Sequence, residues 1–314
     1  MRHIETRRRP AIRRLGIALV LAIAFGASFA SAFGQVQDIE YGIGKWDPES
    51  GLGNHRVVVR VEAPPAPVPA KPDKAVQKLR KRIGPPLPPA AVVRIDWRRR
   101  DAEPEKKNVI VVDAATGERV AEVLPVRLDN ETGEFLFKPK TVPGDYYFYF
   151  LPYKSEGRKN YPNVKYDPPA WSSDPDLTTR AAGHYSSDFE TSIKANENLL
   201  RAEVVEFQSA DAFGAFTPME IVARSAERQA LLAAHPGAPY LLFPEDRSLS
   251  IRMADALPYR WISKGPQGAF RGEAARGEYF TFQIGVWAAR GPIADLEVKF
   301  SDLVRTEAKI DGVT

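Results

Sequence analysis

The sequence predicts a mainly β protein, in which a β-sandwich with short helices and long loops is followed by the first strands of a second β-sandwich. Two observations support this fold class. Short runs of β-branched and aromatic residues alternate with Gly-containing turns, as they do in sandwiches. No Gly-rich phosphate-binding loop stands between a strand and a helix. With 314 residues, of which 44% are hydrophobic, the chain can form two cores.

Residues 1–32 have the three parts of a secretory signal peptide. Arginines precede an uncharged apolar segment over 15–29, and Ala30-Ser31-Ala32 places small residues where signal peptidase cleaves. We expect export to the periplasm or the extracellular space, with cleavage after Ala32. A membrane anchor is the alternative, although the apolar segment is short for one. The Arg13-Arg14 pair leaves both Sec and twin-arginine export open.

The basic character of the chain resides in this signal segment. The whole sequence has a net charge of +4 and a pI near 9.1. Residues 1–32 contain six Arg and one Glu, so removing their charge of +5 leaves −1 on the mature chain. We therefore expect no nucleic-acid partner.

The sequence contains no cysteine and four scattered histidines. Without cysteine there is neither a disulfide framework nor a lipid-modified residue after the signal, so we expect no stable membrane insertion once the signal is cleaved. We expect structural roles, no metal site and no cofactor, because metal-ligand spacing is lacking among His3, His55, His184 and His235.

A first β-sandwich domain is expected over residues 55–264, after an irregular lead-in over 33–54. It begins with the strand His55–Val61, which is rich in β-branched residues. A Pro-rich insertion with nine prolines follows over 64–89, and a regular sheet cannot contain it. Between Lys71 and Lys107 there are twelve Lys or Arg and five Asp or Glu. This excess indicates a surface for an acidic polymer or, as we prefer, a solvated loop.

Further strands are predicted where apolar and polar residues alternate or aromatic residues cluster. In the first half of the domain they cover 92–97, 109–112, 119–128, 134–138 and 146–150. Residues 152–177 are expected to be a loop.

The rest of the first domain is predicted to mix helices and strands. We expect a short helix over 189–200, strands over 201–207, 219–224 and 240–243, and a helix over 226–234 capped by Ser225. The start of a second β-sandwich domain is expected over 265–314, where a strand over 278–287 and a strand over 296–300 form a hairpin with apolar faces. A hairpin alone is marginal in water, so we expect this second domain to be incomplete or to pack on the first.

Three carboxylates suggest glycosidase chemistry, namely Glu220, Glu245 and Asp246. Glycoside hydrolysis uses two carboxyl groups at a set separation. Neighbours on a strand point to opposite faces, so Glu245 and Asp246 are not expected to converge. We expect them to form a structural motif with Arg247 and Trp261, in which a carboxylate pairs with Arg247 or accepts hydrogen bonds from backbone amides. The serines lack a nucleophile elbow, so no catalytic residue is assigned.

Sugar contact is a better-supported role than catalysis, because flat aromatic faces beside planar hydrogen-bonding groups suit carbohydrate. Trp97, Arg98 and Arg99 offer both features, and Trp171 and Tyr185 are further candidate platforms. Trp261 and Trp287 are expected to be core residues. The alternative for the arginine cluster is pairing with the acidic residues that follow it, Asp101, Glu103 and Glu105.

Several of these segments together resemble a known family. They are "HRVVVRV", "WRRRDAEPEKKNVIVVDAATGERV", "PGDYYFYFLPY", "PMEIVA", "LLFPEDR", "IRMADALPYRWI" and "GEYFTFQIGVWA". Over most of residues 55–304 the chain is similar to the amino-terminal region of large exported proteins related to glycoside hydrolase family 123. The resemblance implies β-domains that precede a (β/α)8 barrel, in which an acid pair and the substrate acetamido group cleave β-linked N-acetylgalactosamine. The Pro-rich insertion is longer here than the family's short turn.

The resemblance implies that catalysis belongs to the barrel, which these 314 residues do not include. We therefore expect a non-catalytic N-terminal accessory region of a glycoside-hydrolase-like exported protein. Its expected partners are a glycan and a C-terminal barrel domain of the same or an adjacent gene product. The alternative is a free-standing secreted β-sandwich binding module that uses Trp97 and the arginines, and a glycosidase in its own right is the least favoured. The first hypothesis predicts an exposed apolar surface around Tyr279–Phe300, whereas the second predicts that this surface is covered within the chain.

Overall fold

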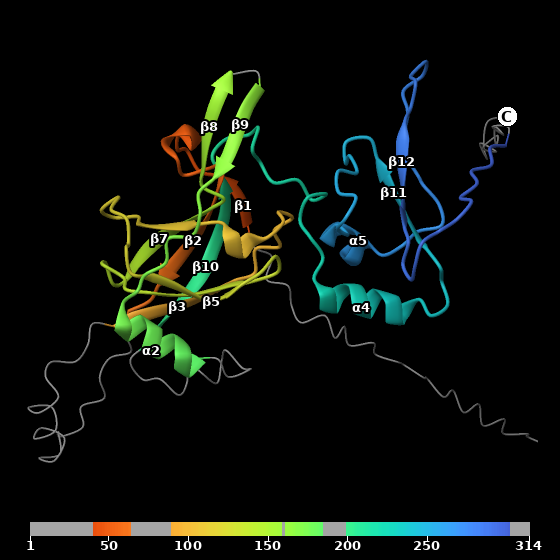
Figure 1. The fold of residues 1–314 in the computed structure, drawn as a ribbon. Coiled ribbons are helices and arrows are strands. Elements are labelled where there is room, and N and C mark those ends of the chain that lie inside the picture. Colours follow the sequence, from red (N-terminus) through yellow and green to blue (C-terminus); the bar gives the residue numbers. More distant parts are fainter. Residues whose placement is uncertain (1–39, 64–88, 159–160, 185–198, 302–314) are drawn as a thin grey trace, which may run out of the picture. The chain divides into compact units, whose positions relative to one another are not determined.

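The computed structural model describes residues 40–63, 89–158, 161–184 and 199–301 (Figure 1). It is mainly β, with 35% strand and 13% helix, and contains a curled sheet of many strands with a few short helices. The predicted fold class is confirmed. The signal peptide, the Pro-rich insertion up to residue 88, Tyr185 and most of the helix predicted over 189–200 lie outside the described residues.

The main sheet has eight strands in the order β4-β7-β2-β10-β3-β6-β5, and β1 pairs with β10 beside this path. The strands are β1 Glu40–Ile43, β2 His55–Val61, β3 Ala90–Ile95, β4 Val109–Asp113, β5 Val123–Leu128, β6 Gly133–Phe137, β7 Gly144–Phe150 and β10 Leu199–Ser209. The predicted strands between 55 and 150 and the strand over 201–207 are therefore present, with ends that differ by a few residues. Two short 3₁₀ helices also occur in the described part of the chain, η1 Pro48–Ser50 and η2 Pro104–Lys106.

Strand β10 lies at the centre of this sheet. It runs antiparallel to β2, where Ser209 lies opposite His55, and parallel to both β3 and β1. On either side the sheet continues with antiparallel pairs, β2 with β7 and β3 with β6. The β-branched residues that predicted β2 and β3 therefore form the middle of the sheet, where burial is greatest.

The sheet curls until its two halves face each other. Phe137 of β6 contacts Tyr146 and Phe148 of β7, with ring centroids 5.1 and 5.3 Å apart. Three strands separate β6 from β7 in the sheet order, so these rings can meet only because the sheet closes on itself. Figure 1 shows the strands wrapped around a common interior. The inward residues alternate along each strand, as Val57, Val59 and Val61 do on β2, and form the main core.

A second, smaller apolar cluster lies against another part of the sheet. Leu177 of α2, which spans Pro175–His184, packs with Ala90, Val92 and Leu136. Asp174 accepts hydrogen bonds from the backbone N–H groups of Asp176 and Leu177 and so stabilises the start of this helix.

The prediction of a loop over residues 152–177 is wrong. This region contains the antiparallel ribbon of β8, Tyr153–Arg158, and β9, Tyr161–Tyr166, followed by the first residues of α2. The side chains of β8 are mostly exposed, so the segment lacks the alternation of buried and exposed positions that identifies a strand in sequence.

Residues 219–289 build a further core around β11, Leu241–Asp246, and β12, Phe282–Trp287, which pair antiparallel. Two helices contribute to it, α4 Ser225–Ala234 and α5 Tyr259–Lys264. Its buried members are Met219, Ala223, Leu231, Leu241, Phe243, Leu257, Trp261 and Ile262. None of the helices in the described part of the chain is both long and apolar enough to cross a membrane.

Two predictions in this part of the chain are wrong. The hairpin between 278–287 and 296–300 does not form, because β12 pairs with β11 and residues 296–300 are not in a strand. Residues 219–224 are also not a strand, although Val222 makes an isolated bridge to Pro258. In both cases the apolar residues predicted strands correctly or incorrectly depending on the partner, because the sequence pattern does not say with which segment a strand pairs. Tertiary structure decides that pairing.

Helix α4 begins one residue earlier than predicted. Its N-cap is Arg224, and the Arg224 backbone N–H donates to Glu227 Oε2 at 2.8 Å. Ser225, the predicted cap, is the first helical residue, and its N–H donates to Glu131 Oε1 at 2.6 Å. A carboxylate from the turn between β5 and β6 therefore satisfies one of the free amides at this helix start.

His55 is packed between aromatic rings at the edge of the main core. Its ring stacks on Phe150 at 5.7 Å and lies 4.5 Å from the ring of Phe216, and Nε2 lies 2.9 Å from the carbonyl oxygen of Gly214. Burial lowers the pKa of His55 below its ordinary value, against smaller opposing effects of the Gly214 carbonyl and Glu220. The folded protein therefore binds a proton at this site less readily than the unfolded chain does.

This difference predicts a pH-dependent stability. Above the ordinary histidine pKa, near 6.5, neither state is protonated and His55 causes no pH dependence. As the pH falls below that value the unfolded chain gains a proton first, so the free energy of unfolding decreases until the folded pKa is reached. We expect urea unfolding to show a steeper loss of stability between pH 7.5 and 5 in the wild type than in His55→Phe, which keeps an aromatic ring. Parallel curves for the two proteins would contradict this assignment.

Candidate functional site

Trp97, the predicted sugar platform, is part of the main core. Its side chain is only 4% exposed, and its indole N–H donates to the Asp129 carbonyl at 2.8 Å. The ring packs against Phe135 and Phe150. A Cβ at Gly133 would lie 2.7 Å from the Trp97 ring, so glycine is needed there for close packing. The prediction of an exposed aromatic face is wrong, because this ring is buried in the apolar interior of the sheet.

Arg99 is buried with Trp97 and forms a local ion pair. It donates from Nε and Nη2 to Asp101 at 2.7 and 2.8 Å, and its guanidinium lies over the Trp97 ring. Burial alone would raise the pKa of Asp101, but hydrogen bonds and charge from Arg99 and Lys107 hold it below its ordinary value. The pairing of the arginine cluster with Asp101 therefore accounts for Arg99 better than a role at the surface does.

Arg98 is buried too, and it joins the main sheet to α4. Its backbone has a φ of 49°, in the left-handed region, which turns the side chain away from the path of its neighbours. The guanidinium donates to both carboxylate oxygens of Glu227 at 2.6 and 2.7 Å and to the Val222 carbonyl at 3.2 Å. It also lies 4.1 Å from the ring centroid of Tyr259. This is a bidentate pair, the strongest geometry for arginine and carboxylate.

The charge of Glu227 is stabilised by these contacts. Burial by itself would raise the pKa of this carboxyl, but hydrogen bonds from the Arg98 side chain and the Arg224 amide bring it below its ordinary value. Because Glu227 lies in the first turn of α4, the helix dipole adds to the same effect.

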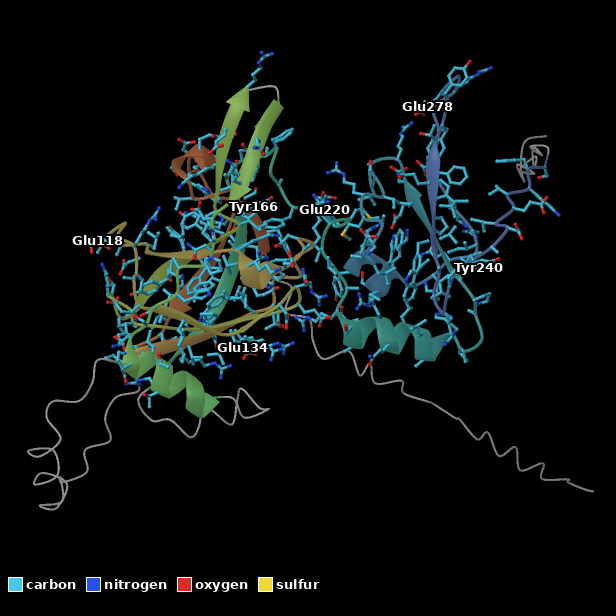
Figure 2. All side chains as sticks on the ribbon, in the orientation of Figure 1. Glu118, Glu134, Tyr166, Glu220, Tyr240 and Glu278 are labelled. Atoms are coloured by element: carbon cyan, nitrogen blue, oxygen red, sulfur yellow. The ribbon has the colours of Figure 1, made fainter. Side chains whose placement is uncertain are left out.

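Two further ion pairs connect the same two parts of the chain. Arg224 donates to Asp96 at 2.6 Å, and Arg100 lies 3.1 Å from Glu220. Within the 219–289 part, Glu220, labelled in Figure 2, also lies 3.5 Å from Arg252. Together with Arg98 and Glu227, these residues make a polar junction between the main sheet and the 219–289 core, which we call the Arg98 junction.

The remaining predicted sugar contacts are Trp171 and Tyr185. Trp171 is partly buried, and its ring centroid lies 6.2 Å from that of Phe135. Tyr185 lies outside the described residues. Of the two predicted aromatic sugar contacts that the structure describes, Trp97 is buried and Trp171 is partly exposed.

Glu245 is the centre of a second polar group, at the end of β11. Its carboxylate is 1% exposed, and Oε1 accepts hydrogen bonds from Arg260 Nε at 3.0 Å and Trp261 Nε1 at 3.1 Å. Oε2 accepts from Arg260 Nη2 at 3.4 Å and Lys264 Nζ at 3.5 Å. Two cations and an indole therefore compensate this buried charge, which would otherwise be costly.

The ring of Trp261 is fixed by packing as well as by its hydrogen bond. It stacks on Phe243 with centroids 4.5 Å apart and an interplanar angle of 1°. On β12, a Cβ at Gly285 would lie 2.3 Å from the same ring, so a side chain there would displace the tryptophan. As expected from the sequence, Trp261 is a core residue.

Asp246 and Arg247 interact with other residues than those that bind Glu245. Asp246 Oδ1 accepts from the backbone N–H of Ser248 at 2.9 Å and from its hydroxyl at 2.7 Å. These two hydrogen bonds keep the pKa of Asp246 below its ordinary value. Arg247 pairs with Glu278, labelled in Figure 2. The carboxylates of Glu245 and Asp246 therefore have separate partners.

A hollow of about 330 Å³ opens beside Glu245. Its wall combines residues from the end of β11, from α5 and from the chain that follows α5, namely Pro244, Glu245, Asp246, Leu249, Arg260, Lys264, Gln267, Ala269, Phe270 and Arg271. Sequence patterns pointed to Glu245 and Asp246 but not to the cations. Arg260 and Lys264 are four residues apart on a short helix, a spacing that could have signalled them. Arg271 carried no signal, because it lies in an irregular segment.

Among the described residues, no group of three His, Asp or Glu side chains is arranged to bind a metal ion. The described polar clusters are instead ion pairs between cations and carboxylates.

Comparison with known proteins identifies the class of the chain. Residues 44–210, more than half of the sequence, match the family described as glycoside hydrolase 123, N-terminal domain. The chain belongs to this family, and the match begins just after β1 and extends past the end of β10. No curated protein matches the chain, and no solved structure does.

The Arg98 junction makes a prediction about stability. Side-chain exposure is 5% for Arg98 and 13% for Glu227, so removing one partner leaves a largely buried charge without compensation. We expect Arg98→Ala to lower the free energy of unfolding by about 3–5 kcal/mol in urea titrations. The double variant Arg98→Met, Glu227→Leu should recover much of this loss, because no buried charge remains.

The exposed pair of Lys106 and Glu103 provides the control for this experiment. Lys106→Ala should leave the unfolding midpoint unchanged, since surface pairs contribute little. An Arg98→Ala variant as stable as Lys106→Ala would contradict the importance of the junction.

Proposed function

We propose that this chain is the non-catalytic accessory region of an exported glycoside-hydrolase-like protein and that it packs against the catalytic part through one face of β12. Family membership supports the first half of the proposal, because the matching family is an N-terminal domain of glycoside hydrolases. The exposed apolar face of β12 supports the second half. We also propose that residues 1–32 direct export and are cleaved after Ala32.

The apolar face consists of alternate residues of one strand. Phe282, Ile284 and Val286 are 48%, 51% and 36% exposed, and alternate residues of a strand lie on the same face. On the other face, Gln283 accepts a hydrogen bond from the Ile251 amide and Gly285 contacts Trp261. One face of β12 is thus directed into the 219–289 core, whereas its other face exposes three apolar side chains.

Residues close to β12 in the sequence are also apolar and exposed. Tyr279 is 98% exposed, and the segment after β12 exposes Leu296, Val298 and Phe300 at 55%, 64% and 92%. Exposed apolar side chains that cluster on a protein surface mark an interaction site, and those of β12 lie on one face of a single strand. This exposure favours the accessory region over the free-standing module, which predicts that the same surface is covered within the chain.

The carboxylates support placing the chemistry outside these residues. Glu245 is enclosed by Arg260, Trp261 and Lys264, and Asp246 is bonded to Ser248. Glu220 lies between two arginines. Each candidate carboxylate is thus engaged in stabilising the fold, and none of these three is paired with a second carboxyl group in the way glycoside hydrolysis uses.

The proposal predicts that the purified chain does not hydrolyse glycosides. Aryl glycosides, including β-N-acetylgalactosaminides, should be cleaved no faster by the chain than by a heat-denatured sample. Turnover that disappears in Glu245→Gln or Glu220→Gln, while the circular dichroism spectrum is retained, would overturn the assignment as non-catalytic.

The proposal also predicts a specific site for apolar dyes. The wild-type chain should enhance the fluorescence of 1-anilinonaphthalene-8-sulfonate, and the double variant Ile284→Thr, Val286→Thr should reduce this signal because it makes the β12 face polar. Phe213→Ser is the matched control, since Phe213 is fully exposed but lies away from β12 in the sequence. Equal signals from the wild type and the double variant would remove β12 as the docking face.

A further inference from the structure

The hollow beside Glu245 is a candidate ligand site that the family match does not cover, because the match ends at residue 210. Its volume of about 330 Å³ is at the small end of the range for ligand pockets, roughly 300–1,000 Å³. A hollow of this size suits a single ring rather than a long chain of sugars.

The wall of the hollow has more hydrogen-bond donors than acceptors. Arg260 uses Nε and Nη2 on Glu245, and no described residue accepts from its Nη1. Lys264 makes long contacts, to the Pro244 carbonyl at 3.3 Å and to Glu245 at 3.5 Å. Arg271 is exposed and forms no ion pair within the described part of the chain.

Three of the four carboxylate oxygens at the hollow already accept hydrogen bonds. Both oxygens of Glu245 accept hydrogen bonds from Arg260, Trp261 or Lys264, and Oδ1 of Asp246 accepts two from Ser248. Three cations and two carboxylates line the hollow, so its side chains carry a net charge of +1. A ligand that complements this wall must supply acceptors and negative charge.

The buried carboxylate also fixes the donors in place. Glu245 is 1% exposed, whereas the side chains of Arg260 and Lys264 are 31% and 33% exposed. The carboxylate thus anchors the two cations from inside, and each keeps a portion of its surface toward solvent. Such preorganised donors lose little freedom when a ligand binds.

The remaining wall is apolar and includes an aromatic ring. Phe270 stacks on Phe282 with centroids 4.7 Å apart and an interplanar angle of 7°, and Leu249 and Pro244 complete the apolar side. A pyranose ring presents an apolar face to such a surface while its substituents reach polar groups.

We propose that this hollow binds an acidic sugar residue, whose ring lies against Phe270 and whose carboxylate or sulfate group accepts hydrogen bonds from Arg260, Lys264 and Arg271. The inference rests on the proposed function in one respect, namely that the chain is part of a glycoside-hydrolase-like protein, a class that acts on carbohydrate. It adds to the accessory role a contact with carbohydrate, together with the location and the chemical class of that contact.

Isothermal titration calorimetry on the purified chain tests this site. The probes are an oligouronate, a sulfated oligosaccharide, a neutral oligosaccharide of equal length and inorganic phosphate. We expect saturable binding of at least one of the two acidic oligosaccharides, weakened by added salt, and no binding of the neutral one. Which of the two acidic oligosaccharides binds shows whether the site recognises a carboxylate or a sulfate group.

Two variants locate the binding. Arg271→Ala and Lys264→Met should each weaken it about tenfold or more, because each removes a charged donor. Arg276→Ala is the matched control, since Arg276 is an exposed arginine five positions further along the chain and outside the hollow; it should leave the affinity unchanged. Near-ultraviolet circular dichroism, which reports on the packing of the aromatic side chains, Trp261 among them, checks that the variants keep the fold.

Three results would overturn the proposal. They are no saturable binding of either acidic oligosaccharide, equal binding by the neutral one, and binding that Arg271→Ala and Lys264→Met leave unchanged. Binding of phosphate alone would overturn the assignment to sugar. None of these outcomes affects the tests of glycoside hydrolysis and dye binding, so a failure here is distinguishable from a failure of the accessory role.

Discussion

The fold depends on closing one sheet on itself until its aromatic inner face is covered. Phe137 on β6 and Tyr146 and Phe148 on β7 meet across the interior, although three strands separate β6 and β7 in the sheet order. Large aromatic side chains contribute much of the free energy of such contacts. This closure buries the inner faces of the central strands at once, as Val57, Val59 and Val61 of β2 show.

The segment after β3 shows how strongly the closure acts. Trp97 is drawn into the interior, and Gly133 provides the space its ring needs. With Trp97 inside, Arg98 adopts a left-handed backbone conformation and reaches Glu227 on α4. A short motif that in sequence resembles an exposed sugar platform is thus divided between a core residue and a buried ion pair.

The 219–289 core is organised on a different principle. It is small, and beside it a buried carboxylate at the end of β11, Glu245, accepts hydrogen bonds from Arg260, Trp261 and Lys264. A buried charge is tolerated only when such partners are present. The same arrangement leaves donors directed at the hollow beside β11, while β12 keeps its other face apolar and exposed. The two surfaces differ in chemistry, which is why we assign them different partners, an acidic sugar and another protein surface.

Local patterns of residues were enough to establish the mainly β class, most strands between residues 55 and 150 and the core position of Trp261. These features depend on runs of β-branched and aromatic residues, and such runs persist in any structure that buries them. The family was indicated by the resemblance of whole segments, and the match over residues 44–210 shows it. The pairing of β12 with β11, the burial of Trp97 and the meeting of Arg260, Lys264 and Arg271 at one hollow came from the folded chain, because each depends on which distant segments meet. The sequence shows which apolar or charged side chains must be buried or paired. Which residue each of them contacts depends on how the whole chain folds around its cores.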